Sequence, residues 1–186
     1  MKNIVVFASG SGSNFETIVK KLHGDHCNVA LLVCDQPDAY CLERAKNLGI
    51  KILQLALKDF ATKVDYELEI IKHLKVINPD LIVLAGYMKL ISETLLNEYE
   101  GKIINIHPSL LPAFPGVDGI GDAYRYGVKV MGVTVHFVDA GIDTGEIIDQ
   151  ASFKREEDDD LQAVTQKIHA IEHELYPQVI RRLLGN

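Results

Sequence analysis

Short apolar runs alternate with longer amphipathic stretches through the first hundred residues of the chain. Such runs are typical of parallel strands that are buried on both faces. The predicted strands span residues 3–8, 28–34, 51–55, 80–85 and 102–106. Helical spacing covers residues 13–22, 39–48, 63–76 and 92–99, and Gly24 and Gly49 stand where C-terminal caps are expected. This alternation predicts a doubly wound α/β sheet.

The pattern changes after Gly116. One further helix is expected at 121–127, and two extended runs, 129–139 and 146–155, should form an antiparallel pair at the sheet edge. The acidic run REEDDD precedes a long helical pattern over 161–184, where carboxylates favour the positive end of a helix. We interpret that run as a helix start and not as a metal site. The fold class is therefore α/β and mostly parallel, with an antiparallel C-terminal edge and a long C-terminal helix.

Composition narrows the possible partners. A chain of 186 residues with 47% hydrophobic and 24% charged residues fits one ordinary globular domain, 1–186. The net charge of −7 gives no general attraction to nucleic acid or anionic membranes, so an anionic ligand needs a local site. Apolar runs are too short for a signal peptide or a membrane helix. We therefore expect a cytoplasmic protein whose partners are small molecules, with neither nucleic acid nor membrane.

Two patterns superficially suggest metal ligands. Cys27, Cys34 and Cys41 are spaced by seven without a CxxC pair, so reduced, buried thiols are expected. The sequence HAIEH, from His169 to His173, matches the inverted zinc protease motif. No acid, His or Cys follows Glu174 to provide another ligand, and we predict no metal site.

The loop SGSGSN after the first predicted strand offers free backbone amides at a helix start, which suit a phosphate or carboxylate. It lacks the lysine of a P-loop. A dinucleotide site would need a third glycine where Phe15 stands, but Asp35 could bind a ribose, so this alternative stays open. The other interpretations are a monophosphate held by Gly12, Ser13 and Asn14, and a plain turn in which Ser13 caps the helix.

The run KIINIHPSLLPAFPG ends the fifth predicted strand with polar groups. Alternation places Asn105 and His107 on one side of the strand, facing the region where open α/β sheets bind ligands. An imidazole can donate a proton, and an amide can hydrogen-bond an oxyanion, as acyl transfer requires. Asp139 or Asp143, in a glycine-flanked loop, could orient the imidazole, and spacing does not choose between them. A simple packing role for His107 is the structural alternative.

Several segments together resemble the phosphoribosylglycinamide formyltransferases of the folate-dependent formyltransferase superfamily. The resemblance rests on SGSGSN, INPDLIVLAGYMKLI, EGKIINIHPSLLPAFPG, GVTVHFVDAGIDTGEII and EHELYP, and it extends from Lys2 to about Arg182. It implies a Rossmann-like formyltransferase fold. The glycine loop and the short length favour these enzymes over methionyl-tRNA formyltransferase and formyltetrahydrofolate hydrolase, which carry additional domains.

The resemblance also implies roles for individual residues. It makes His107 the catalytic acid, Asn105 its partner at the formyl oxygen and Asp143, not Asp139, the carboxylate beside the imidazole. The implied substrate-binding residues are Gly12, Ser13, Asn14 and Glu172. The implied folate-binding residues are Lys63, Met88, Lys89, Leu90, Ile91 and Asn105. Arginine is usual where this chain has Lys63 and Lys89, and lysine loses the bidentate contact with a carboxylate.

The activity implied by the resemblance is formyl transfer from 10-formyltetrahydrofolate to the amine of 5-phosphoribosylglycinamide, in de novo purine biosynthesis. The folate is a co-substrate and no metal is required. A formyltetrahydrofolate hydrolase, and a nucleotide-binding oxidoreductase or noncatalytic module, are the alternatives. We expect a monomer or homodimer, with a phosphate-binding half (1–100) and a catalytic and folate-binding half (101–186).

Overall fold

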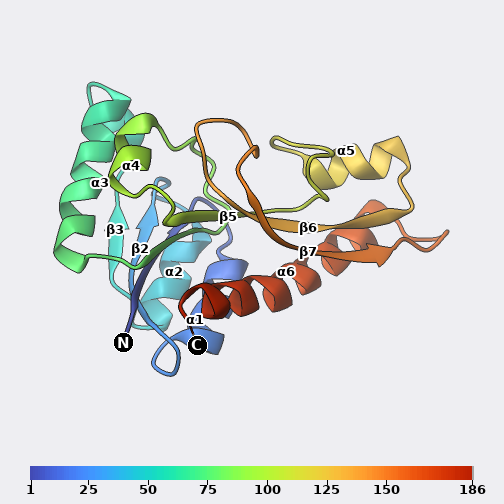
Figure 1. Ribbon diagram of the computed structural model, residues 1–186, viewed down its shortest axis with the longest axis horizontal. Helices are drawn as coiled ribbons and strands as arrows, with labels where there is room; N and C mark the ends of the chain where they lie inside the picture. Colours follow the sequence, from blue (N-terminus) through green and yellow to red (C-terminus); the bar gives the residue numbers. More distant parts are fainter. Residues whose placement is uncertain (186) are drawn as a thin grey trace.

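The computed structural model describes residues 1–185 and is built around one seven-stranded sheet of order β3-β2-β1-β4-β5-β6-β7 (Figure 1). The strands are β1 (Asn3–Ala8), β2 (Asn28–Cys34), β3 (Ile52–Gln54), β4 (Leu81–Leu84), β5 (Ile103–His107), β6 (Val130–Phe137) and β7 (Ile147–Lys154). β1 to β5 are parallel, whereas β6 pairs antiparallel with β5 and β7 pairs antiparallel with β6. The predicted mostly parallel sheet with an antiparallel edge is confirmed.

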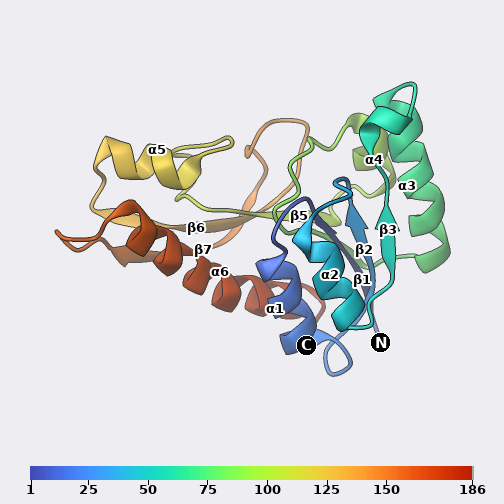
Figure 2. The same ribbon diagram turned by 180° about the vertical axis from the view of Figure 1, so that it is seen from behind.

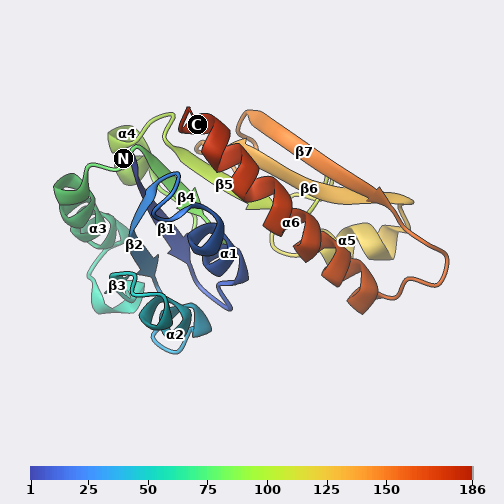
Figure 3. The same cartoon turned by 90° about the horizontal axis from the view of Figure 1, so that it is seen from below.

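Helices cover both faces of the parallel part of the sheet. The helices are α1 (Ser13–Leu22), α2 (Tyr40–Asn47), α3 (Lys63–Ile77), α4 (Glu93–Glu98), α5 (Gly119–Tyr126), which lies beside β6 and β7 (Figure 1), and α6 (Leu161–Leu183). A 3₁₀ turn, η1 (Leu57–Asp59), was not predicted from the sequence pattern. α2, α1 and α6 lie side by side on one face (Figures 2 and 3), and α3 and α4 pack together on the other. The expected doubly wound arrangement is present.

The buried strand β1 shows why both faces are covered. Its alternate residues Ile4 and Val6 belong to the core beneath α1, α2 and α6, whereas Val5 and Phe7 belong to the core beneath α3 and α4. All four side chains are fully buried. A strand with two apolar faces is stable only between two layers of helices, because each face otherwise stays in contact with water.

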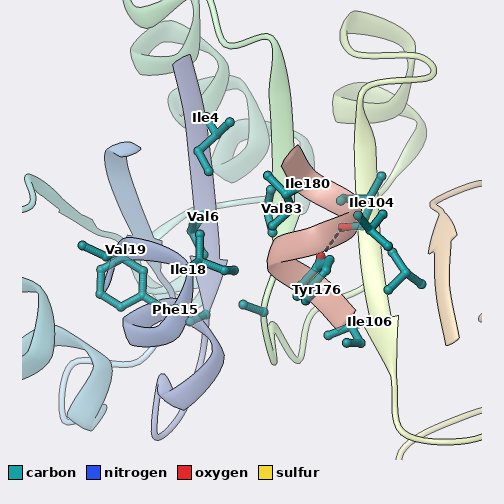
Figure 4. Close-up of a cluster of buried hydrophobic side chains, with 14 of the residues drawn as sticks. Ile4, Val6, Phe15, Ile18, Val19, Val83, Ile104, Ile106, Tyr176 and Ile180 are labelled. Carbon is teal, nitrogen blue, oxygen red and sulfur yellow. Dashed lines mark hydrogen bonds between the residues drawn. The ribbon is translucent and has the colours of Figure 1, made fainter. Parts of the chain in front are cut away.

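The long helix α6 is fixed to the sheet by one buried tyrosine. Tyr176 is completely buried, and its hydroxyl donates to the carbonyl oxygens of Leu84 in β4 at 2.8 Å and Ile104 in β5 at 3.3 Å (Figure 4). A buried hydroxyl without a partner is costly, so this contact selects one position of the helix. The helix consequently crosses β4 and β5, and β5 carries Asn105 and His107 near its carboxyl end.

The start of α6 and the end of α2 agree with the predicted caps, whereas the end of α1 does not. Asp160 caps α6 by accepting the Ala163 N–H at 2.7 Å, so the acidic run does begin a helix. Gly49 closes α2 with positive φ, as Ile50 N–H donates to Ala45 O at 2.9 Å. The cap assigned to Gly24 is wrong: α1 ends at Leu22 with His23 as its C-cap, and the Gly24 N–H donates to Cys27 O in the turn before β2.

The three cysteines are buried and free, as expected. Cys41 in α2 donates its thiol hydrogen to the sulfur of Cys34 at 3.5 Å. Burial raises the pKa of the Cys27 thiol to about 11, so Cys27 remains a neutral, apolar part of the core. None of the helices within residues 1–185 has the length and apolar character needed to cross a membrane.

The strand order places a reversal at the middle of the sheet. The chain leaves β1 towards β2 on one side, and it returns through α3 to β4 on the other side of β1. The loops that follow β1 and β4 therefore diverge at the carboxyl ends of neighbouring strands. In open α/β sheets such a crevice is where ligands bind.

Candidate active site

A cleft of about 510 Å³ opens at this reversal point. It is lined by Gly10–Asn14 after β1, Leu84–Ile91 after β4, Asn105–Pro108 at the end of β5, Gly116 and Val117, His136, Val138–Asp143 after β6, and His169 and Glu172 of α6. Every predicted site residue except Lys63 lines it. Lys63 is the first residue of α3 and lies outside the cleft lining. One cavity thus brings together residues from both halves of the chain.

The glycine loop turns sharply at Gly12. This residue has φ +75°, and a Cβ atom there would lie 2.5 Å from the Cβ of Cys41, so no other residue fits without movement. α1 begins at Ser13 directly after the turn, and no side chain caps its N-terminus. The interpretation in which Ser13 caps the helix is therefore wrong. The N-terminal amides of α1 remain available to an anion that enters the cleft.

The structure contradicts a dinucleotide site at this loop. Phe15 is fully buried in the core, at the position where the fingerprint requires a glycine for close packing of helix and strand. Asp35 has a fully buried side chain that accepts hydrogen bonds from Ser9 and Gln36, and it does not line the cleft. Asp35 is therefore not placed to bind a ribose hydroxyl in the cleft.

Glu172 lies across the cleft wall from the glycine loop. Asn14 Nδ2 donates to Glu172 Oε2 at 3.1 Å, although the two residues are 158 positions apart. His169 Nδ1 donates to the same oxygen at 2.8 Å. The hydrogen bond to Glu172 raises the pKa of His169 above its ordinary value, against the opposing effect of burial. Asn14 Oδ1 is buried without a partner in residues 1–185, so this wall retains an unused acceptor.

The motif HAIEH does not assemble a metal centre in the described part of the chain. The His169 and His173 rings stack with centroids 6.5 Å apart, and His169 is engaged by Glu172. Residues 1–185 contain no group of three or more His, Cys, Asp or Glu side chains arranged to hold a metal ion.

His107 is held at both ring nitrogens. Its Nε2 donates to the carbonyl oxygen of Phe114 at 2.8 Å, and its Nδ1 lies 3.4 Å from Asp143 Oδ2. The side chain is almost completely buried. Gly119, at the start of α5, packs so closely that a Cβ atom there would lie 2.9 Å from Nε2. The ring can therefore face a reacting group only from the Nδ1 side, next to Asp143.

Asp143 is held as a carboxylate. It has φ +53°, an uncommon conformation for a residue other than glycine, and its Oδ2 accepts the Gly116 N–H at 2.8 Å. Burial raises the pKa of this carboxyl, but the neighbouring His136, the Gly116 amide and the charge of His107 outweigh burial and leave the pKa below its ordinary value. Asp143 is accordingly ionised at neutral pH.

Asp139 takes a different position. Its Oδ1 accepts the Gly141 N–H at 3.0 Å and the Thr144 hydroxyl at 2.7 Å, so it shapes its own loop. The choice that sequence spacing left open is thereby decided geometrically, because Asp143 and not Asp139 lies beside His107.

Asn105 is oriented by His136, a residue that the sequence interpretation missed. The two residues are paired across β5 and β6, and Asn105 Nδ2 lies 3.3 Å from His136 Nε2. His136 Nδ1 donates to the Phe137 carbonyl at 2.8 Å, which fixes the orientation of the ring. The same Nε2 is 3.6 Å from Asp143 Oδ1. The alternation of VTVHF indicated an inward side chain, but the strand register was needed to place it next to Asn105.

The remaining cleft wall is apolar. Met88 and Leu90, after β4, expose 64% and 57% of their surfaces, and Val117 and Ile142 on the opposite loops expose 92% and 53%. Exposed apolar side chains that line one cavity indicate a ligand with a large apolar part. The family resemblance implied the 88–91 segment but not Val117 or Ile142.

Comparison with known proteins agrees with this geometry. The formyl transferase family model matches residues 2–180. Phosphoribosylglycinamide formyltransferase from Bacillus subtilis (strain 168) is 52% identical, over 100% of this chain and 96% of that protein. The crystal structure of glycinamide ribonucleotide transformylase 1 from Geobacillus kaustophilus has a TM-score of 0.96 at 53% identity, over 100% of this chain and 100% of that chain. The Escherichia coli (strain K12) phosphoribosylglycinamide formyltransferase is 37% identical, over 96% of this chain and 85% of that protein. The chain therefore belongs to the formyl transferase family, among the phosphoribosylglycinamide formyltransferases.

Proposed function

We propose that this protein transfers the formyl group of 10-formyltetrahydrofolate to the amine of 5-phosphoribosylglycinamide, in purine biosynthesis. The observation that carries the proposal is the single cleft in which a buried His107 and Asp143 pair meets an uncapped helix start and an apolar wall. Each feature suits one chemical group of the substrates. The His107 and Asp143 pair suits the formyl carbonyl, the helix start suits the phosphate, and the apolar wall suits the pterin of the folate.

The anionic substrate is assigned to the glycine loop. Gly12, Ser13 and Asn14 would receive the phosphate on backbone amides of α1, where the helix dipole favours negative charge. Glu172 would accept a hydrogen bond from a ribose hydroxyl, and its contact with Asn14 supports that arrangement. The protein is net acidic, so this local site must provide the attraction for the phosphate.

The chemistry is assigned to Asn105, His107 and Asp143. The neutral amine attacks the formyl carbon, and the new C–N bond leaves a negative charge on the formyl oxygen. The Asn105 amide and protonated His107 Nδ1 stabilise that charge, because an oxyanion accepts stronger hydrogen bonds than a carbonyl oxygen does. Breaking the bond to the folate nitrogen completes the transfer, and the proton lost by the amine passes to that nitrogen.

The co-substrate fits the apolar wall. Met88, Leu90 and Ile91 would contact the pterin, with Asn105 beside the formyl group. The basic side chains Lys63 and Lys89 would attract the glutamate tail, a contact that is modest at a surface. The reaction as written forms no covalent enzyme intermediate and assigns no step to a metal ion.

We further propose a cytoplasmic enzyme that acts as a monomer or homodimer, in one domain with the halves 1–100 and 101–186. The bond between Asn14 and Glu172 crosses that division, so the halves share the substrate site. Asn186 lies outside the described residues.

A coupled assay tests the function. Folate deformylation is followed with purified protein and 10-formyltetrahydrofolate, with and without phosphoribosylglycinamide. The expected result is deformylation that requires the ribosyl substrate and yields its formylated product. Release of formate at the same rate without it would instead establish the hydrolase alternative, in which water is the acceptor.

A further inference from the structure

A buried carboxylate outside the cleft has no part in the proposed reaction. Asp35 directly follows β2, is 2% exposed and does not line the cleft. Ser9 Oγ donates to Asp35 Oδ1 at 2.5 Å, and Gln36 Nε2 donates to Oδ2 at 3.0 Å. A buried charge is retained only where several partners compensate for its lost hydration. The partners of Asp35 show which part of the chain this carboxylate holds in place.

Ser9 connects Asp35 to the segment after β4. Its backbone N–H donates to Gly86 O at 3.0 Å, and its Oγ accepts the Met88 N–H at 2.8 Å. A hydroxyl carries one hydrogen, and Asp35 takes it, so the lone pairs of Oγ are left for Met88. The charge on Asp35 thus fixes the direction of the hydrogen bond that anchors the apolar cleft wall.

Lys89 contacts the same carboxylate. Its Nζ lies 3.9 Å from Asp35 Oδ2, and its side chain is 37% exposed while that of Asp35 is fully buried. An ammonium at this distance compensates a buried negative charge. Lys89 lines the cleft, but its Nζ lies within ion-pair distance of Asp35, so a role in binding the glutamate tail would compete with that contact.

We infer that Asp35 is a positioning residue for the folate-binding segment Met88–Ile91, acting through Ser9 and Lys89. The inference deepens the proposed function and rests on it for the identity of the ligand. The relay itself, from Asp35 through Ser9 to the Met88 amide, exists independently of any ligand. Its consequence is that the charge at position 35 controls folate affinity from outside the cleft.

Hydrogen exchange at the Met88 amide tests the relay without substrate. Asp35→Asn and Ser9→Ala should each speed exchange of this amide by roughly fivefold or more, since a lost hydrogen bond is typically worth that ratio. Asp38→Asn, the same change at an exposed site in the same loop, is the control and should leave it unchanged. Unchanged Met88 exchange in both folded variants would overturn the relay. Should Asp35→Asn fail to fold, Ser9→Ala alone decides.

Kinetics then separate positioning from a general loss of structure. Asp35→Asn should raise the KM for 10-formyltetrahydrofolate roughly tenfold, with the KM for phosphoribosylglycinamide and kcat changed less than about twofold. Equal losses for both substrates would overturn the assignment to the folate segment. If the wild type shows no formyl transfer at all, the proposed function is wrong. Hydrogen exchange at the Met88 amide still tests the relay, because that measurement needs no substrate.

A variant that combines Asp35→Asn with Lys89→Met tests whether Lys89 interacts with Asp35 or with the glutamate tail. If Lys89 serves Asp35, Lys89→Met should raise KM equally for monoglutamyl and polyglutamyl folates, and adding it to Asp35→Asn should cause little further loss. Lys58→Met, at an exposed position, is the matched control. A larger effect on the polyglutamyl folate, additive with Asp35→Asn, would show that Lys89 binds the tail and would overturn this part of the inference.

Discussion

Asp143 Oδ2 lies 3.4 Å from His107 Nδ1 while the same oxygen accepts the Gly116 N–H at 2.8 Å. The carboxylate therefore joins the imidazole to the loop that follows the Pro-rich segment. Because His107 Nε2 is occupied by the Phe114 carbonyl, the Nδ1 side, next to Asp143, is the side of the ring left for a group in the cleft.

The first prediction is that Asn105, His107 and Asp143 act as one unit. General acid catalysis is typically worth ~10² to 10⁴ in rate and an oxyanion donor ~10² to 10³, so Asn105→Ala, His107→Ala and Asp143→Asn should each lower kcat heavily. The double variant of His107 and Asp143 should be little worse than the more damaging single change, because both act on one developing charge.

Asp139→Asn is the matched control for Asp143→Asn, since Asp139 bonds only its own loop among the contacts described above. Steady-state kcat for all variants provides the measurement. Additive losses, or an equal loss in Asp139→Asn, would show that no such unit exists.

The second prediction concerns the glycine loop. Gly12→Val places a branched side chain at positive φ and against Cys41, so it should disturb the amides of α1. The KM for phosphoribosylglycinamide should rise by well over tenfold, while the KM for 10-formyltetrahydrofolate changes far less. Gly10→Ala, where an added Cβ meets nothing within 4 Å, should retain both values. Comparable losses of both substrates in folded Gly12→Val would place the phosphate elsewhere.

The third prediction uses the ionisation of Asp143. Its native pKa is lowered, because the effects of His136, the Gly116 amide and His107 exceed that of burial. The carboxylate therefore contributes stability that is present above its unfolded pKa of about 3.9 and is lost as pH falls through the native pKa. The stability difference between wild type and Asp143→Asn should be largest near neutral pH and shrink below about pH 4. Urea unfolding across that range measures it, and a difference independent of pH would contradict the ionic role.

The fourth prediction concerns the attachment of α6. Tyr176→Phe removes a buried donor from the Leu84 and Ile104 carbonyls and should lower the free energy of unfolding by about 1 to 2 kcal/mol. For a chain of this length that corresponds to a fall in Tm of roughly 2 to 8 °C. Tyr126→Phe, where the residue is 78% exposed, should leave Tm unchanged. Calorimetry of the two variants compares them directly, and equal Tm values would remove the proposed anchor.

Particular residues show how far sequence alone reaches. The apolar runs around Val6 and Ile104 predicted their strands because a two-sided buried strand has few alternatives. Phe15 already argued against a dinucleotide fingerprint, and its burial agrees. Asp143 could not be separated from Asp139 by spacing, because the decision depends on a positive φ within the loop.

His136 and Gly24 show two limits of prediction from the sequence. The contact of His136 was missed, whereas the helix cap predicted at Gly24 was wrong. His136 lay in a correctly predicted strand, yet its contact with Asn105 depends on the register between two strands, which local pattern does not encode. Gly24 suggested a helix cap because glycine favours positive φ, but the same conformation serves the turn to Cys27. The fold was accessible from periodicity, whereas site geometry required tertiary pairing.

The hydrogen bond between Asn14 and Glu172 has a consequence for the order in which the site forms during translation. The two residues are 158 positions apart, so at ribosomal rates of about 5 to 20 residues per second Asn14 is made roughly eight to thirty seconds before its partner. During that interval the glycine loop can form with β1 and α1, but the wall from α6 is still missing. A nascent chain therefore completes the wall of the proposed anion-binding site only late in translation, and a ribosome stall before residue 172 leaves the glycine loop without that wall.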